Sequence, residues 1–139
     1  LQTVLDASKP PPPDIIAVLP SPRLLPILAF GHRGAAADLL EIRATNFLMR
    51  SLAHRPRADR DHLQTLYDGV VALDPQDAEA YWRAAVYFFA IADQPEVARA
   101  MIQRGLRDVD PAHPRRYLLA YELAAQTIIQ AMGRPPAER

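Results

Sequence analysis

The chain of 139 residues contains 16 basic and 16 acidic side chains, so its formal net charge is zero, and half of its residues are hydrophobic. This balance predicts one folded domain with a core, and it argues against nucleic acid as a partner because no global basic field would attract phosphate. The absence of cysteine excludes disulfides and thiolate metal sites, and no apolar run approaches the ~18 residues of a membrane span.

Residues 1–20 are expected to form an extended, proline-rich arm. The run Lys9–Pro13 favours polyproline II because each proline fixes φ and lacks an N–H donor. The apolar segment Asp14–Pro20 is too short for a stable helix. We interpret the arm as a spacer to an upstream anchor, and a ligand for an aromatic-lined groove is the alternative. Because the chain begins at Leu1, a preceding signal peptide or membrane anchor in a bacterial cell envelope is one hypothesis, and a cytoplasmic location is another.

Residues 21–133 are expected to be helical. Ser21 and Pro22 suit the start of a short helix, which the glycines at positions 31 and 34 should end. A long amphipathic helix should follow over about residues 35–53, and its apolar face is predicted from Leu39, Ile42, Asn46/Phe47 and Met49. The next helix should open at Asp59 or Asp61 and close at Asp74-Pro75. Its inner face is predicted from Leu63, Leu66, Val70 and Leu73.

The second half of the chain should continue as short helices joined by tight turns. Asp77 is a predicted cap for a helix over residues 78–92, and its partner helix should span residues 96–109. Pro114 should open the last helix, Gly133 should stop it, and residues 134–139 form a polar tail. Short connections make consecutive helices antiparallel neighbours, and no single pair can bury its apolar face, so the pairs must stack.

A set of residues recurs at a fixed offset of 36. The first set is Gly69, Asp74, Pro75 and Tyr81, and the second is Gly105, Asp110, Pro111 and Tyr117. A period near 34 residues, with a proline closing one helix and an aromatic residue opening the next, is typical of a helical repeat.

These residues resemble the tetratricopeptide repeat family. The best match is Ala80-Tyr81-x-x-Ala84-Ala85-x-x-Phe88, followed by Ala98 at the helix crossing and Asp110-Pro111 at the end. One good unit and two degenerate flanking units cover about residues 35–132. The resemblance implies an all-α fold of about six helices, in which antiparallel pairs stack as a short tetratricopeptide-like α-solenoid. A generic stack of α-hairpins is the alternative.

The resemblance also implies a non-catalytic scaffold for protein–protein interaction or assembly, with its ligand in the concave groove lined by the first helices. Counted from Tyr81, the implied groove positions of the good unit are Glu79, Trp82, Val86 and Phe89. The offset of 36 adds Arg43, Asn46, Arg50 and Ala53 before them, and Arg115, Leu118, Glu122 and Ala125 after them. Trp82 and Phe89 would be natural hot spots, because large aromatic side chains supply most of the buried area. Alternatively, the N-terminal arm covers them.

Two other functions are weighed against this one. In the first, the chain is a structural subunit of a homo-oligomer or larger complex whose arm fills a groove. In the second, it is a metal-dependent enzyme with zinc at His54, Asp59, Asp61 and His62. The spacing of these residues matches no ligand motif and arginines interrupt it, so a solvated loop is the preferred interpretation. No phosphate-binding glycine loop or serine elbow is present, and we expect neither enzymatic activity nor a cofactor.

Overall fold

The computed structural model describes residues 20–51 and 57–133, apart from the side chains of residues 50, 51 and 57–60. Within these ranges every regular element is a helix, which confirms the all-α class. The helices are α2 (Leu25–Leu28), α3 (Arg33–Ser51), α4 (Arg57–Leu73), α5 (Ala78–Ala90), α6 (Pro95–Asp108) and α7 (Tyr117–Gly133). None of these helices has the length and apolar character needed to cross a membrane. Residues 1–19 of the predicted arm (1–20) and the whole predicted tail (134–139) lie outside the described residues.

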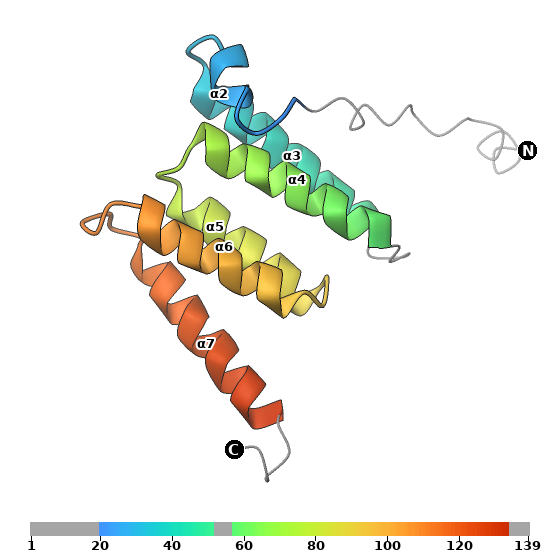
Figure 1. Ribbon diagram of the computed structural model, residues 1–139, viewed down its shortest axis with the longest axis vertical. Coiled ribbons are helices and arrows are strands. Elements are labelled where there is room, and N and C mark those ends of the chain that lie inside the picture. Colours follow the sequence, from blue (N-terminus) through green and yellow to red (C-terminus); the bar gives the residue numbers. More distant parts are fainter. Residues whose placement is uncertain (1–19, 52–56, 134–139) are drawn as a thin grey trace, which may run out of the picture.

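The helices form two antiparallel pairs followed by a single helix. α3 pairs with α4 and α5 pairs with α6, and in Figure 1 the second helices α4 and α6 lie in front of the first helices. α7 lies at the lower end of the stack and contacts both α5 and α6. This succession is the repeat-like arrangement of helix pairs expected from the sequence.

The predicted repeat is visible in the loops that close the two pairs. The Asp74 carboxylate accepts a hydrogen bond from the backbone N–H of Gln76 at 3.1 Å, and the Asp110 carboxylate accepts one from Ala112 at 2.7 Å. Gln76 joins the two loops, because its side chain donates to the carbonyl of Asp108 at 2.7 Å and accepts from the N–H of Asp110 at 2.9 Å. The offset of 36 therefore relates two turns with the same hydrogen-bonding pattern.

Local sequence explains the limits of α5 and α6. Asp77 caps α5, since its carboxylate accepts from the N–H groups of Glu79 and Ala80 at 2.9 and 3.1 Å. Asp93 adopts a positive φ of 54° in the turn that follows, and α6 then begins with Pro95 at its first position. The last helix begins later than predicted, at Tyr117, because residues 114–116 form turns.

The predicted inner face of α4 is correct, because Leu63, Leu66, Val70 and Leu73 are all buried. The prediction for α3 was wrong except for Phe47, which packs against the core. Leu39, Ile42 and Met49 are exposed, and the buried stripe consists of Ala37, Leu40, Ala44 and Leu48. α3 also begins at Arg33, so Gly34 lies in its first turn and does not break a helix.

Close approach between α3 and α4 explains which stripe of α3 is buried. A Cβ added to Gly69 of α4 would stand 2.9 Å from Cδ1 of Leu40. The equivalent Gly105 of α6 lies against Tyr81 of α5 in the same way. Leu40 and Tyr81 differ in number by 41, so the offset of 36 that relates α4 to α6 does not relate α3 to α5.

Candidate functional site

α5 presents an apolar stripe along the edge of its buried side. Trp82, Val86 and Phe89 follow one another at intervals of four and three residues, and each is half-buried. The buried side next to the stripe carries residues that are fully inaccessible to solvent: Tyr81, Ala84, Ala85 and Phe88. Trp82 and Phe89 pack their inner edges against the core and leave part of each ring at the surface.

A chain of ion pairs crosses the first helices beside this stripe. Arg83 of α5 pairs with Glu41 of α3 and with Glu79 at 3.0 Å. Glu79 pairs in turn with Arg115, in the turn before α7. These side chains are partly exposed, so each pair contributes about 1 kcal/mol or less to stability. Their main consequence is that the charges around the stripe are already compensated within the chain.

The predicted positions on α7 belong to a helix that contacts α5. Leu118, Glu122 and Ala125 are half-buried, and Glu122 accepts a hydrogen bond from the side chain of Gln126 at 2.9 Å. Contacts between α5 and α7, together with the Glu79–Arg115 ion pair, join the two helices. We name the surface formed by Trp82, Val86, Phe89, Leu118 and Ala125 the α5–α7 face.

The predicted positions on α3 are placed differently. Asn46 is exposed and shares a helical face with Ile42 and Met49, opposite the buried stripe, and Arg43 is half-buried. Ala53 and the side chain of Arg50 lie outside the described residues. The α3 residue that contacts α5 is Glu41, which sequence reasoning did not select. The sequence feature that could have indicated a charged contact here is the i, i+4 pair of Glu79 and Arg83, which marks a charged edge on α5.

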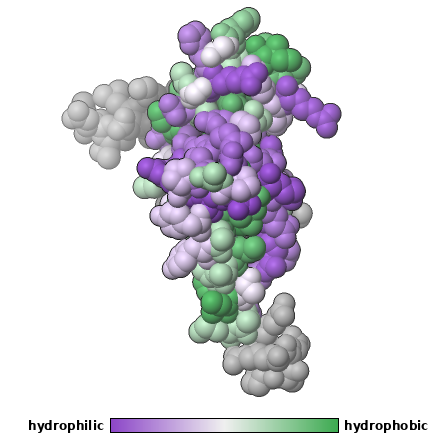
Figure 2. All heavy atoms as spheres, turned by 90° about the vertical axis from the view of Figure 1, so that its left-hand side faces the viewer, coloured by the Kyte–Doolittle hydropathy of each residue, from purple (hydrophilic) through white to green (hydrophobic). Residues whose placement is uncertain are grey.

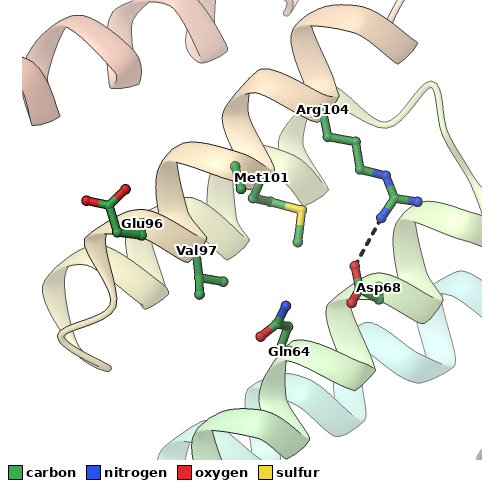
Figure 3. A pocket seen from close by; sticks show the side chains of 7 residues that line it. Gln64, Asp68, Glu96, Val97, Met101 and Arg104 are labelled. Atoms are coloured by element: carbon green, nitrogen blue, oxygen red, sulfur yellow. Dashed lines mark hydrogen bonds and ion pairs between the residues drawn. The ribbon is translucent and has the colours of Figure 1, made fainter.

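One hollow lies away from this face, and a second lies beside the Glu79–Arg115 ion pair. The first, of ≈ 290 Å³, lies between α4 and α6, where Val97 and Met101 point towards Gln64 (Figure 3). Arg104 and Asp68 pair at 3.0 Å at one end of it, and burial raises the pKa of the Asp68 carboxyl although Arg104 opposes the shift. The second hollow, of ≈ 360 Å³, is formed by the loops after α4 and before α7, and Glu79 and Arg115 contribute to its lining.

The hypothetical zinc ligands are described only in part. His54 and the side chain of Asp59 lie outside the described residues, so the zinc site stays a hypothesis. His62 packs its ring against Phe47, with ring centroids 4.8 Å apart. Among the side chains that the structure describes, no group of three or more carboxylate or imidazole side chains could hold a metal ion.

Comparisons of the chain with protein-family models, curated proteins and solved structures give no match. The tetratricopeptide resemblance therefore depends on the residues quoted above and stays a prediction. The fold and the faces of its helices are the basis for a functional proposal.

Proposed function

We propose that the chain is a non-catalytic, tetratricopeptide-like scaffold that binds a segment of another protein on the α5–α7 face. The observation that carries the proposal is the half-buried apolar stripe of Trp82, Val86 and Phe89 on α5. The two large aromatic side chains, Trp82 and Phe89, are seven residues apart and lie on one face of α5. They offer a partner apolar area at little cost in side-chain entropy. Trp82 packs against the core, so its half-buried ring is also pre-organised for binding.

The charges beside the stripe indicate what kind of partner the face suits. Glu79 and Arg83 are each engaged in ion pairs within the chain, so a strongly charged partner would have to displace existing pairs. An apolar segment needs no such exchange, and it gains about 25 cal/mol for each Å² of apolar surface that it covers. The partner that this face supports is a protein segment with apolar anchors, bound with weak dependence on salt.

Affinity capture tests the proposal. The chain serves as bait in a lysate of its source organism beside the double variant Trp82→Ala, Phe89→Ala, with helicity checked by circular dichroism. The matched control is Leu39→Ala, Ile42→Ala, which removes exposed apolar side chains from α3. We expect a partner that the wild type and the control capture and the α5 variant loses. Unchanged capture by a folded α5 variant would contradict the assignment of the face.

The proposed alternative, a structural subunit of a homo-oligomer, predicts a different capture result. If the bait returns only further copies of its own chain, the scaffold proposal loses its support. Residues 1–19 of the arm that this alternative would place in a groove lie outside the described residues, and deletion of residues 1–20 is the variant that tests the contribution of the arm.

A further inference from the structure

α7 has apolar residues on all sides, although only one side packs on the other residues that the structure describes. Leu119 and Gln126 are buried towards α5 and α6, and the only charged side chain of the helix is Glu122. The opposite side is the outer face of α7, formed by Tyr117, Tyr121, Ala124, Ile128 and Met132. All five residues are exposed. Figure 2 shows hydrophobic side chains gathered at the α7 end, below a mostly hydrophilic middle.

The repeat relates this outer face to a buried face of α5. At the offset of 36, the equivalents of Tyr81, Ala84, Ala85 and Phe88 are Tyr117, Ala120, Tyr121 and Ala124. The α5 residues are wholly inaccessible and belong to the core that α5 forms with its partner helix α6. The α7 equivalents are exposed, with Tyr117 at 66% and Tyr121 at 70%. The outer face of α7 therefore has the composition of a surface that packs against another helix.

We propose that a second copy of this chain covers the outer face of α7, with the two α7 helices packed antiparallel about a two-fold axis. The face carries no charge, so its contact with an identical face brings no like charges together. A contact of this kind uses one surface of each copy and closes as a dimer. Ala120 and Ala124, one turn apart, let the two helix backbones approach closely.

The order of side chains along α7 favours the antiparallel orientation. The first half of the outer face holds the two tyrosines, and the second half holds Ile128 and Met132. The midpoint of Tyr117 and Met132 falls between Ala124 and Ala125. An antiparallel pair centred there places Tyr121 opposite the partner's Ile128, and Tyr117 opposite the partner's Met132. Each tyrosine then packs on an aliphatic or thioether side chain, and the helix dipoles also oppose each other.

The area available is sufficient for a dimer. A covered aromatic side chain buries about 150–250 Å², and both tyrosines expose about two thirds of that surface. With Ile128 and Met132, the apolar surface that would be covered is on the order of 500 Å² per copy, or about 1,000 Å² in total, which is the lower limit of a specific interface. The dimer should therefore dissociate on dilution.

The first test is the molar mass of the full 139-residue chain at tens of micromolar, by light scattering and sedimentation equilibrium. We expect twice the chain mass of 15.5 kDa. Ile128→Glu should weaken the dimer at least tenfold. The matched control is Ile42→Glu on α3, because Ile42 and Ile128 are both 58% exposed but lie at opposite ends of the stack. The control should leave the dimer intact.

Each other result of this test would overturn the proposal. A wild-type monomer would exclude a second copy and leave an arm or another protein as the occupant. Dissociation by both substitutions, or growth beyond a dimer, would indicate head-to-tail association between the α7 and α3 ends. An Ile128→Glu variant that keeps its helicity and remains dimeric would place the interface elsewhere.

A cross-linking experiment tests the antiparallel register, and the absence of native cysteine makes it direct. Ala124→Cys places a thiol near the two-fold axis, where it should form a disulfide between copies. Tyr117→Cys places the two thiols about 20 Å apart in an antiparallel pair but side by side in a parallel pair. We expect cross-linking at position 124 alone. Cross-linking at position 117, or at neither position, would contradict the proposed packing.

Discussion

Gly105 of α6 lies directly against the ring of Tyr81 of α5. A Cβ added to Gly105 would stand 2.8 Å from Cγ of Tyr81 and 2.9 Å from Cδ1 of Leu119. Gly69 occupies the equivalent position in α4, where an added Cβ would stand 2.9 Å from Cδ1 of Leu40. Both helix pairs thus depend on a glycine at the same repeat position for their close approach.

Substitution of the two glycines should have unequal effects. In a helix interior, Gly→Ala normally stabilises by up to about 1 kcal/mol. At Gly105 the added methyl meets the base of a buried ring that cannot move, so we expect a net destabilisation of about 1–3 kcal/mol. At Gly69 it meets the ends of leucine side chains, which can rotate, so the change should be smaller. Urea unfolding measures both.

The control for this comparison is Gly34→Ala, where nothing lies within 4 Å of the added Cβ. It should not destabilise the chain. If Gly105→Ala unfolds at the same urea concentration as the control, the close approach of α5 and α6 described above is incorrect.

Removal of the Tyr81 hydroxyl should cost about 1–2 kcal/mol. The O–H group donates to the Asp108 carboxylate at 3.1 Å, and a hydrogen bond to a charged acceptor contributes more than a neutral one. Tyr81→Phe keeps the ring against Gly105 and removes only this bond. Tyr121→Phe is the matched control, because Tyr121 is exposed and its substitution should change the unfolding free energy little. Equal effects would show that the Tyr81–Asp108 bond contributes no stability.

Stability should fall in alkaline solution. Burial raises the pKa values of Tyr67 and Tyr81 above the usual value of about 10. Above that pH the unfolded chain releases phenolic protons that the folded chain retains. The stabilisation is therefore complete below about pH 10 and is lost as the pH rises further. Unfolding free energies from about pH 9 to about pH 11 should show this decline, and Tyr81→Phe should reduce its slope. A flat profile would contradict the burial of both rings.

Replacement of Phe30 should stabilise the chain. Its φ of 47° lies in the left-handed region that bulky residues avoid, and its side chain is 84% exposed. Asparagine tolerates this conformation, so Phe30→Asn should raise the unfolding free energy by about 0.5–1 kcal/mol. Phe30→Ala removes the same ring but keeps the conformational penalty, and should bring less benefit. An equal gain from both variants would attribute the effect to loss of the ring.

The sequence was sufficient to predict the helices and the repeat, because these depend on local features. Capping by Asp77, the proline at the start of α6 and the two Asp-Pro turns all act within a few residues. The buried stripe of α4 was also predictable, since its large apolar residues recur on one side of the helix.

The orientation of α3 could not be predicted in the same way. This helix has two apolar stripes, and the larger side chains lie on the exposed one. The alanine-rich stripe is buried because it fits against Gly69 of α4, which is a tertiary contact. The same limit applies to Glu41, whose contact with Arg83 depends on how α3 and α5 are placed.

Because α3 is oriented differently from the prediction, its predicted site residues are separated from those on α5 and α7. The helices α5 and α7, between which the offset of 36 was carried, contact each other in the structure. Asn46 was assigned by carrying that offset back to α3, where the register has shifted. α7 begins the last degenerate unit of the predicted repeat, and its apolar residues on all sides are the sequence feature on which the proposed second packing face depends.

The most direct measurement for the proposed function uses Trp82, the only tryptophan of the chain. Short random peptides selected by display on the full chain would be titrated into it while the tryptophan emission is recorded. Binding at the α5–α7 face should shift the emission to shorter wavelength in a saturable manner, and Phe89→Ala should weaken the binding. Selected peptides that bind without changing the emission, and equally well to Phe89→Ala, would contradict the assignment of this face.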